Sequence, residues 1–349
     1  MLLCVEANRM ATEGAILDCL AASYRLDLEG AEYVRHLVEA AAPLLDRGLG
    51  VIAYTYDARD RERPTIDHFA TSKRFDPSWL PPYYAAVEAA GHDGPPYPTG
   101  FQAWRHMMCG QASAVAKMRP FLPLFAHIGG SRDTFAVNAL DASGRGLWLG
   151  APLPSTTKVP ARRITLFTRF AAHLTSALRL RRSAGTSKPL RAAVLSPNGT
   201  LLDAEKGEGV VEAREELRLA TVAFDQARTK KMRGDVELAT RRWRPLVVSR
   251  WSLLDEFDSD GRRFVVAVEN GPPTRPPRKD LSEREHQVMT QAHLGHTDKV
   301  IAYELGLSCS TVRVLLHRAT RKLGASTRRE ALARFDALTK ERVEEKPER

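Results

Sequence analysis

The chain of 349 residues has few cysteines and no long apolar run. Its four cysteines, Cys4, Cys19, Cys109 and Cys309, are widely spaced and form no C-x-x-C pair, so neither a zinc site nor a disulfide framework is indicated. No stretch approaches the ~18 apolar residues needed to cross a bilayer. The N-terminus has no basic residues ahead of its apolar ones, which argues against a secretory signal. We therefore expect a reducing, cytoplasmic compartment and no membrane partner.

The motifs that mark common enzyme classes are also absent. The sequence contains no G-x-S-x-G motif, no Walker loop and no dinucleotide-binding glycine fingerprint. The histidines of the first half are dispersed and lack metal-ligand spacing. The start of the chain lacks the acidic cluster that a phospho-accepting receiver domain needs. These absences predict a protein that is not an enzyme, with no metal and no cofactor.

Positive charge is in excess and is concentrated near one end. The formal net charge is +10, which is compatible with nucleic acid or an anionic membrane surface as a partner. Residues Leu281 to Phe335 contain nine Lys/Arg and five Asp/Glu, a net charge of +4. The C-terminal part of the chain is therefore the first place to look for an anionic partner.

Two breaks in composition and a charged tail divide the chain. The stretch RRSAGTSKP begins at Arg181 and is rich in small polar residues, and NGPPTRPPRKD begins at Asn270 and contains four prolines. Proline-rich segments of this kind act as semi-rigid extended spacers. We predict domains at 1–183, 189–270 and 281–338, a Pro-rich linker at 271–280 and a charged tail at 339–349.

The pattern of the first domain predicts an α+β sandwich. Residues 32–46 have apolar positions at helical spacing, and residues 48–58 form a buried strand. Two strands follow around the turn Ser143-Gly144, and residues 161–183 form an amphipathic helix. This order of elements resembles that of GAF-type sensor domains.

The second domain is predicted to be a small sheet with one inserted helix. Residues 191–204 form a hairpin around Asn198-Gly199, because both residues of this pair tolerate positive φ. A helical stretch covers about 210–231, and paired strands surround Asp258 to Gly261. The order of elements resembles a PAS-type module, again α+β.

The third block has a helical pattern throughout. Ser282 and Glu285 form the capping box of a first helix, which Gly295 ends. Thr297 caps a short helix, and Ser308 or Ser310 caps a third at 311–323. Gly306 and Gly324 end these two helices, and a last helix begins after Ser326. Each helix boundary has its own physical marker.

The third of these helices has one apolar and one basic face. We expect a common interior to contain Val300, Ile301, Leu305, Leu307, Val312, Leu316, Ala319 and Leu323. The opposite side of helix 311–323 carries Arg313, His317, Arg318, Arg321 and Lys322. A helix of this kind fits the major groove of B-DNA, which is about 12 Å wide. The pattern predicts an all-α helix-turn-helix domain.

Many residues of this block match one family at fixed spacing. They are Leu281, Ser282, Arg284, Glu285, Val288, Gly295, Thr297, Lys299, Ile301, Ala302, Leu305, Ser308, Thr311, Val312, Arg313, Lys322, Leu323, Gly324, Arg329, Glu330 and Ala331. The block resembles the LuxR-type (GerE-type) helix-turn-helix of bacterial transcription regulators. The resemblance covers residues 281–338, and it implies a four-helix DNA-binding domain.

The resemblance implies a role for individual residues. Arg313, Val314 and His317 would face base edges. The residues expected at phosphates, from the resemblance and from the basic, hydroxyl-bearing face of the helix, are Lys299, Ser310, Thr311, Arg318, Arg321 and Lys322. Two positions depart from the family, since Leu315 replaces a common histidine and Ala319 replaces a bulky aliphatic residue.

In this family the last helix usually pairs with that of a second copy. Leu332 and Phe335 would supply the apolar contacts of such a homodimer here. Two-fold symmetry then predicts an inverted-repeat operator with half-sites about one helical turn apart.

Aromatic residues in the first domain raise a second possibility. Trp79, Tyr83, Asp93 and Trp104 loosely resemble the ligand pocket of acyl-homoserine-lactone receptors, although the spacing after Tyr83 departs from that family. Aromatic core packing and a pocket for another small ligand remain alternatives. The signal, a small molecule or a protein, is not identified by the sequence.

The sequence therefore predicts a DNA-binding transcription regulator. Its partners would be double-stranded DNA and a second copy of the chain, with RNA polymerase as a candidate. Two alternatives remain: a signalling enzyme with a regulatory helix-turn-helix tail, or a protein-interaction scaffold whose helical corner binds protein.

Overall fold

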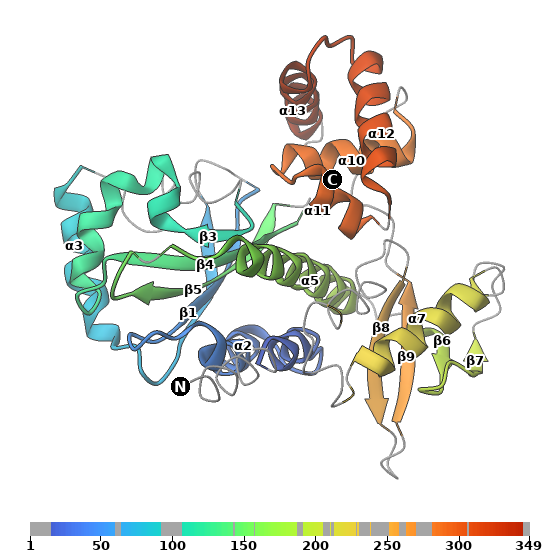
Figure 1. Ribbon diagram of the computed structural model, residues 1–349, viewed down its shortest axis with the longest axis horizontal. Helices are drawn as coiled ribbons and strands as arrows, with labels where there is room; N and C mark the ends of the chain where they lie inside the picture. The colour runs from blue at the N-terminus through green and yellow to red at the C-terminus, as the bar shows by residue number, and fades with distance from the viewer. Residues whose placement is uncertain are drawn as a thin grey trace. The chain divides into compact units, whose positions relative to one another are not determined.

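The chain divides into two compact units, Met1–Asn270 and Gly271–Arg349 (Figure 1). The computed structural model describes residues 15–59, 64–91, 107–141, 144–156, 158–186, 191–204, 210, 213–227, 229, 238, 251–257, 263–269, 281–305 and 307–344. Within this part of the chain, no helix is both long and apolar enough to span a membrane.

The first unit is built around a five-stranded antiparallel sheet with the strand order β2-β1-β5-β4-β3. Its strands are β1 (Ile52–Asp57), β2 (Thr65–Thr71), β3 (Cys109–Gln111), β4 (Asp133–Leu140) and β5 (Arg145–Leu153). The predicted buried strand and hairpin are confirmed as β1, β4 and β5. Gly144, at the hairpin turn, has a φ of +86°, which glycine adopts without strain.

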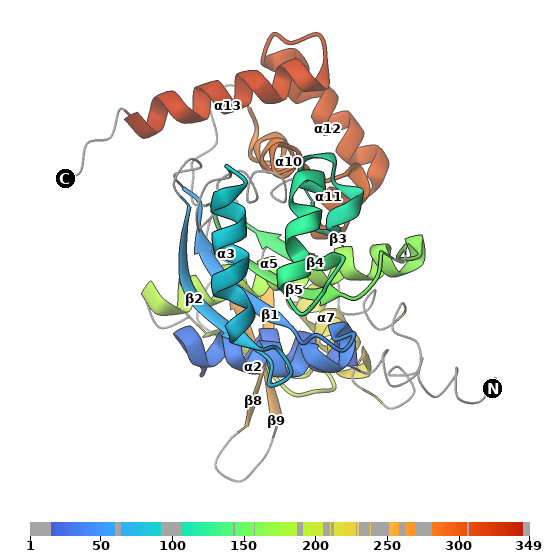
Figure 2. The same cartoon turned by 90° about the vertical axis from the view of Figure 1, so that its left-hand side faces the viewer.

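Helices cover both faces of this sheet (Figure 2). Side chains alternate along a strand, so Val137 joins one buried cluster with α2 (Gly30–Leu45) and α5 (Ala161–Thr186), whereas Ala136 faces the other way. That second face packs against α3 and three 3-10 segments. These are α3 (Leu80–Ala89), η1 (Pro77–Trp79), η2 (Ala112–Ala114) and η3 (Ala116–His127). All eight residues of β4 are buried.

The apolar spacing of the predicted helices is confirmed by their burial. In α2 the buried residues include every one expected from the pattern: Val34, Leu37, Val38, Ala41, Leu44 and Leu45. In α5 the stripe is buried at Phe167, Phe170, Ala171 and Leu174, and half-buried at Ile164 and Leu178. The α+β character of the first block is therefore established, whereas its assignment to GAF-type domains stays a prediction.

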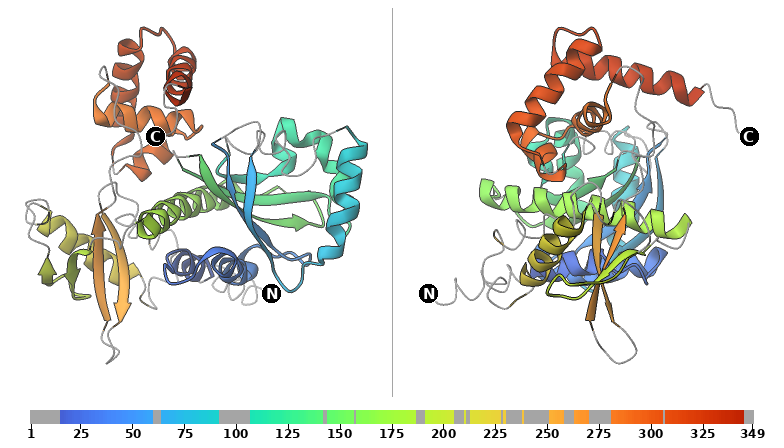
Figure 3. Two further views of the ribbon diagram at one scale, coloured as in Figure 1. Left: turned by 180° about the vertical axis from the view of Figure 1, so that it is seen from behind. Right: turned by 90° about the vertical axis from the view of Figure 1, so that its right-hand side faces the viewer.

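A second, four-stranded antiparallel sheet has the order β7-β6-β9-β8 (Figure 3, left). Its elements are β6 (Arg191–Leu195), β7 (Leu201–Ala204), α7 (Arg214–Ala227), β8 (Trp251–Phe257) and β9 (Arg263–Glu269). The hairpin at Asn198-Gly199 is confirmed, with Gly199 at a φ of +86°. The loop predicted at Asp258 to Gly261 lies outside the described residues, and the PAS-type assignment stays a prediction.

The two sheets share one apolar core. Strand β9 is buried on both sides: Val265 and Ala267 belong to the large cluster that also contains α2 and α5, while Val266 and Val268 pack with Leu180 of α5. Helix α5 therefore contacts both sheets. Residues Met1–Asn270 form one compact unit, and the predicted domain boundary at 183–189 falls inside it.

The second unit is all-helical in its described part. It contains α10 (Glu283–His293), α11 (Asp298–Glu304), α12 (Cys309–Lys322) and α13 (Arg328–Glu344). Its core is separate from that of the first unit and includes Val288, Ile301, Val312 and Ala319, each 0% exposed. Helix α13 continues to Glu344, past residue 339, where the sequence predicts a tail. The predicted linker, 271–280, lies outside the described residues.

A core substitution in the second sheet tests the shared core. Leu195 in β6 is 1% exposed, so Leu195→Ala should lower the free energy of unfolding by about 2–5 kcal/mol. Because the core is shared, calorimetry of the full chain should show the whole transition of Met1–Asn270 moving to lower temperature. Leu202→Ala on β7 is the matched control, since Leu202 is 51% exposed. Two separate transitions for this unit, with only one moving, would contradict the shared core.

Candidate DNA-binding surface

Helix α10 begins at the predicted capping box. The Ser282 hydroxyl accepts the backbone N–H of Glu285 at 3.3 Å, and the Glu285 carboxylate accepts that of Ser282 at 2.8 Å. Both bonds satisfy backbone donors that a helix start leaves unpaired. The entry of the chain into this unit is therefore fixed by local sequence.

A tight turn joins α11 to α12. Thr297 caps α11 through a hydrogen bond from the backbone N–H of Val300, and Ser308 caps α12 by accepting that of Thr311 at 3.0 Å. Of the two capping residues considered, Ser308 is thus the one used. In the turn between them, the N–H of Leu307 donates to the carbonyl of Ala302 at 2.9 Å. Ile301 and Val312 are fully buried between the helices, so the two elements form a helix-turn-helix.

Helix α12 has one buried and one exposed side. Its buried residues are Val312, Leu316 and Ala319, followed by Leu323 at its end, a spacing that keeps them on one helical face. The exposed residues are Ser310, Thr311, Arg313, Val314, His317, Arg318, Arg321 and Lys322. Two of the predicted interior residues, Leu307 and Val300, are only half-buried. Leu307 packs against the core of the domain, whereas Val300 is not part of that core.

The three residues expected at base edges lie together on the exposed side. Arg313 and His317 are four residues apart and are neighbours on one face of the helix, and Val314 lies about 100° around the helix from Arg313. Val314 is 48% exposed, which makes it one of the few large apolar side chains on the described surface. An apolar side chain beside an arginine and a histidine can contact a thymine methyl group while those two residues donate hydrogen bonds to bases.

Arg313 is held only loosely. Its Nε lies 3.5 Å from an Asp298 carboxylate oxygen, and its side chain is 73% exposed. Asp298 is also paired with Arg328, whose Nη1 is 2.6 Å from the other oxygen. Arg313 can therefore turn towards a ligand without leaving the Asp298 carboxylate unpaired.

The start of α12 gathers hydroxyl groups at the positive end of the helix dipole. The Ser308 hydroxyl lies 2.7 Å from that of Ser310 and 2.8 Å from that of Thr311, and all three residues are exposed. Hydroxyls and backbone donors at a helix N-terminus suit phosphate oxygens. Lys299 of α11 is also exposed.

Residues 279–335 match the family model of bacterial regulatory proteins, luxR family. This segment is a LuxR-family helix-turn-helix domain. The match covers the four described helices up to Phe335 of α13.

Two solved structures of SdiA are similar to the chain over most of its length. SdiA in complex with octanoyl-rac-glycerol shares 15% identity over 90% of this chain and 91% of its own, with a TM-score of 0.28. A crystal structure of Escherichia coli SdiA shares 16% identity over 90% and 93%, with a TM-score of 0.27. At these TM-scores the likeness does not extend the assignment beyond the LuxR-family domain. No curated protein matches the chain.

One residue expected at a phosphate is an internal partner instead. Lys322, at the end of α12, places its Nζ 2.7 Å from a carboxylate oxygen of Glu285 in α10. The Glu285 side chain is 4% exposed and that of Lys322 is 44% exposed. The Lys322 ammonium therefore neutralises a buried carboxylate of the LuxR-family domain. This ion pair corrects the expectation that Lys322 contacts a DNA phosphate.

The charge of Glu285 is stabilised by its partners. Burial raises the pKa of this carboxyl, but hydrogen bonds from Lys322 and Ser282 more than offset that effect and hold its pKa below the usual range. A lowered pKa means that Glu285 contributes stability above the pKa of the unfolded chain, about 4.3, and that this contribution is lost as the pH falls.

Phe335 was expected at a dimer interface, but it is buried inside its own domain. Its side chain is 4% exposed, and its ring lies 5.4 Å from that of His286 and 6.1 Å from that of His293. Phe335 thus belongs to the core of its own domain, which corrects its assignment as a dimer contact. Leu332 is half-buried against the same core.

Two aromatic residues of the predicted pocket, Trp79 and Tyr83, lie on the sheet face opposite α2 and α5. Trp79 and Tyr83 pack in one cluster with Phe75 and Trp148, and the Phe75 and Trp79 rings are 5.3 Å apart. Aromatic core packing accounts for both residues. Asp93 and Trp104 lie outside the described residues.

Substituting Lys322 and Arg321 one at a time compares a cation that pairs inside the domain with a neighbouring cation that is expected to face DNA. Lys322→Met should lower the free energy of unfolding of residues 271–349 by about 1–2 kcal/mol at pH 7, because Lys322 is only half-buried. The loss should fade as the pH falls below the ordinary glutamate pKa of about 4.3, and it should vanish only once Glu285 is also protonated in the folded chain. Arg321→Met, the control, should leave stability unchanged. Urea denaturation followed by circular dichroism measures both, and equal losses would remove the role given to Lys322.

Proposed function

We propose that the chain is a DNA-binding transcription regulator that recognises its operator through α12. The observation that carries this proposal is the exposed face of that helix. Arg313, Val314 and His317 lie on it above a fully packed interior, within a LuxR-family domain. Arg313 and His317 can form hydrogen bonds to base edges, and the exposed Val314 beside them can contact a thymine methyl group.

The phosphate contacts we propose come from both helices of the motif. Lys299, Arg318 and Arg321 are exposed cations, and Ser310 and Thr311 are exposed hydroxyls at the start of α12. Contacts of this kind fix the orientation of a protein on the duplex without reading its sequence.

We further propose that the regulator acts as a homodimer. LuxR-type domains usually pair through their last helix, and the half-buried Leu332 of α13 remains a candidate contact. Two-fold pairing leads to an inverted-repeat operator. RNA polymerase is a candidate partner in activation, and the cytoplasm is the proposed compartment.

We propose that the first unit controls DNA binding and that the protein has no enzymatic activity. Its α+β architecture supports a sensory role of GAF-like and PAS-like type, and α5 is the proposed transmitter because it contacts both sheets. A signal that favours one arrangement of the DNA-binding domains would shift the equilibrium between them.

Selection from a random pool of duplex DNA tests this proposal. The full chain and residues 271–349 are used in parallel, since the latter form a separate compact unit. We expect both, or the shorter one alone, to enrich an inverted repeat. Enrichment by neither would contradict the proposal. Affinity that does not fall with salt would favour a protein-binding scaffold instead.

Arg313→Ala should alter the sequence preference. If Arg313 makes a bidentate contact to guanine, its loss should cost about 1–3 kcal/mol in binding and relax the preference at one position of each half-site. Arg329→Ala, on the exposed start of α13, is the matched arginine control. An unchanged binding logo for Arg313→Ala would exclude this residue from base recognition.

Lys299→Ala should weaken binding to all sequences alike. Loss of one phosphate contact should lower the slope of log affinity against log salt by about 1 per bound copy, with the logo unchanged. Fluorescence anisotropy with the selected site and a scrambled duplex measures both slopes. A selective effect on the selected site would assign Lys299 to base recognition instead.

A further inference from the structure

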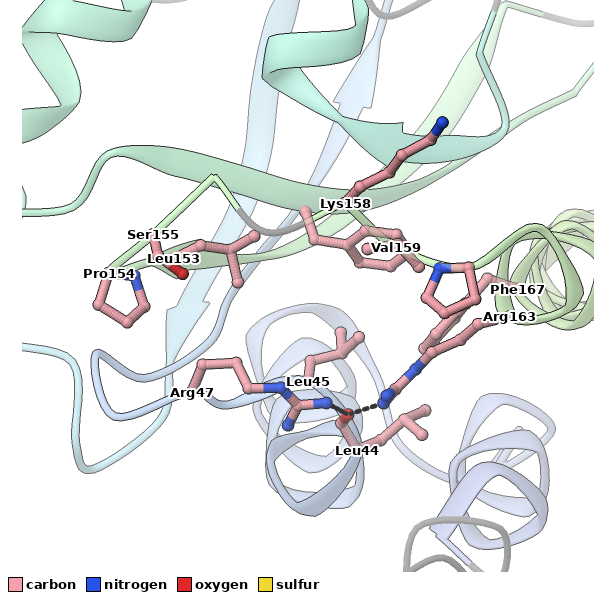
Figure 4. A pocket seen from close by; sticks show the side chains of 12 residues that line it. Leu44, Leu45, Arg47, Leu153, Pro154, Ser155, Lys158, Val159, Arg163 and Phe167 are labelled. Atoms are coloured by element: carbon pink, nitrogen blue, oxygen red, sulfur yellow. Dashed lines mark hydrogen bonds between the residues drawn. The ribbon is translucent and has the colours of Figure 1, made fainter.

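A cavity of about 400 Å³ opens in the first unit, on the sheet face that carries α2 and α5 (Figure 4). It lies between the end of α2, the end of β5 and the start of α5. Its apolar wall consists of Leu44, Leu45, Phe135, Leu153, Val159 and Phe167. Small-molecule sites in proteins typically have volumes of about 300–1,000 Å³ and mostly apolar walls. The cavity is therefore of a size to hold a small apolar group.

Among the described residues that line the cavity, three are cations and none is acidic. Arg47 follows α2, Arg163 lies in the first turn of α5, and Lys158 lies between β5 and α5. In Figure 4 the two guanidinium groups point towards one another, while the amine of Lys158 points away from them. Two like charges thus converge at one end of an apolar cavity.

The two arginines share a single weak acceptor. An Nη2 atom of Arg47 and one of Arg163 each lie 3.4 Å from the carbonyl oxygen of Leu44, and Arg47 also donates to the carbonyl of Asp46 at 2.9 Å. A distance of 3.4 Å is beyond the usual range of about 2.7–3.2 Å. A guanidinium has five N–H donors, so both groups retain donors for a ligand.

Capping of the C-terminus of α2 is the simpler explanation for these arginines. Cations stabilise such a terminus, but one would suffice, and the second brings repulsion. The neighbouring Asp46 carboxylate does not neutralise them, because it accepts from the N–H groups of Gly48 and Gly50 and pairs with Arg74 at 3.0 Å. Burial, and then the charge of Arg47, lowers the pKa of Arg163. Among the described residues, this pair lacks an anionic partner.

We propose that this cavity binds a small amphipathic carboxylate. Arg47 and Arg163 would hold the acid group, and Leu44, Phe135 and Phe167 would enclose the apolar body. Guanidinium groups match carboxylates in geometry and form strong charge-assisted bonds with them. The positive end of the 26-residue helix α5 adds to the attraction. The site is distinct from the aromatic cluster of Trp79 and Tyr83, which lies on the opposite face of the sheet.

A ligand bound in this cavity would contact α5, the helix proposed to transmit the signal. The ligand would touch the end of α2 and the first turn of α5, and α5 continues to the second sheet. Any effect of the ligand on DNA binding rests on the proposed function, whereas binding itself does not. The binding test below uses no DNA, so a failure of the DNA selection would leave its result unaffected.

Calorimetric titration of the full chain tests the site with three probes: decanoate below its micellar concentration, 1-decanol and acetate. We expect decanoate to bind, and decanol and acetate to bind at least about tenfold more weakly, because each lacks either the charge or the apolar body. Equal affinity for decanoate and decanol, or no binding of decanoate, would overturn the proposal.

Substitutions then locate the bound acid. Arg163→Gln and Arg47→Gln should each weaken decanoate binding by about tenfold. Arg47 is exposed, so its substitution keeps the test valid even if Arg163→Gln lowers the melting temperature. Arg119→Gln is the matched control, since Arg119 is exposed on η3, across the sheet from the cavity. Undiminished binding by Arg47→Gln, or an equal loss in Arg119→Gln, would place the ligand elsewhere.

Discussion

The position of the recognition helix depends on one buried carboxylate. Glu285 binds the backbone of Ser282 at the start of α10 and the ammonium of Lys322 at the end of α12. Removing the Lys322 ammonium would leave a carboxylate with 4% exposure without its counter-charge, which is costly in a protein interior. The pair ties the two helices together away from the exposed face, so the residues that face outward on α12 need not contribute to its position. Lys322 thus serves stability, and the residues proposed for recognition are other side chains of the same helix.

In the first unit the corresponding constraint is helix α5. Phe167 and Phe170 of its first half pack with the five-stranded sheet, and Leu180 of its second half packs with Val266 and Val268 of the other sheet. A helix that packs along both halves is held by the two sheets at once. A ligand bound at the first turn of α5 would therefore contact the same helix that packs against the second sheet near its other end. Helix α5 thus offers a physical connection between the cavity and the second sheet.

Local signals explain most of what the sequence predicts correctly. The capping box of Ser282 and Glu285, the Asn198-Gly199 hairpin and the buried stripe of α2 each depend on residues a few positions apart. The missed features depend on distant residues or weak patterns. Lys322 meets Glu285 across 37 residues, and nothing in a linear pattern distinguishes it from Arg321. Strand β2 has five exposed residues in succession and so lacks apolar alternation, and α3 begins with two prolines after Leu80. The convergence of Arg47 and Arg163 likewise requires the fold.

Leu315 and Ala319, the two positions of α12 that depart from the family pattern, both contribute to the core of the domain. Leu315 is half-buried against the core of the domain, so the position where the family resemblance leads us to expect a histidine contributes packing here. Ala319 is fully buried, so a small side chain is accommodated there without exposure to solvent. Neither change reduces the exposed set of Arg313, Val314 and His317. Of the three residues proposed to face bases, Arg313 and His317 can form hydrogen bonds, and Val314 can add only apolar contact. The proposed set of base-facing residues would favour a half-site in which a guanine and a thymine methyl group lie close together in the major groove.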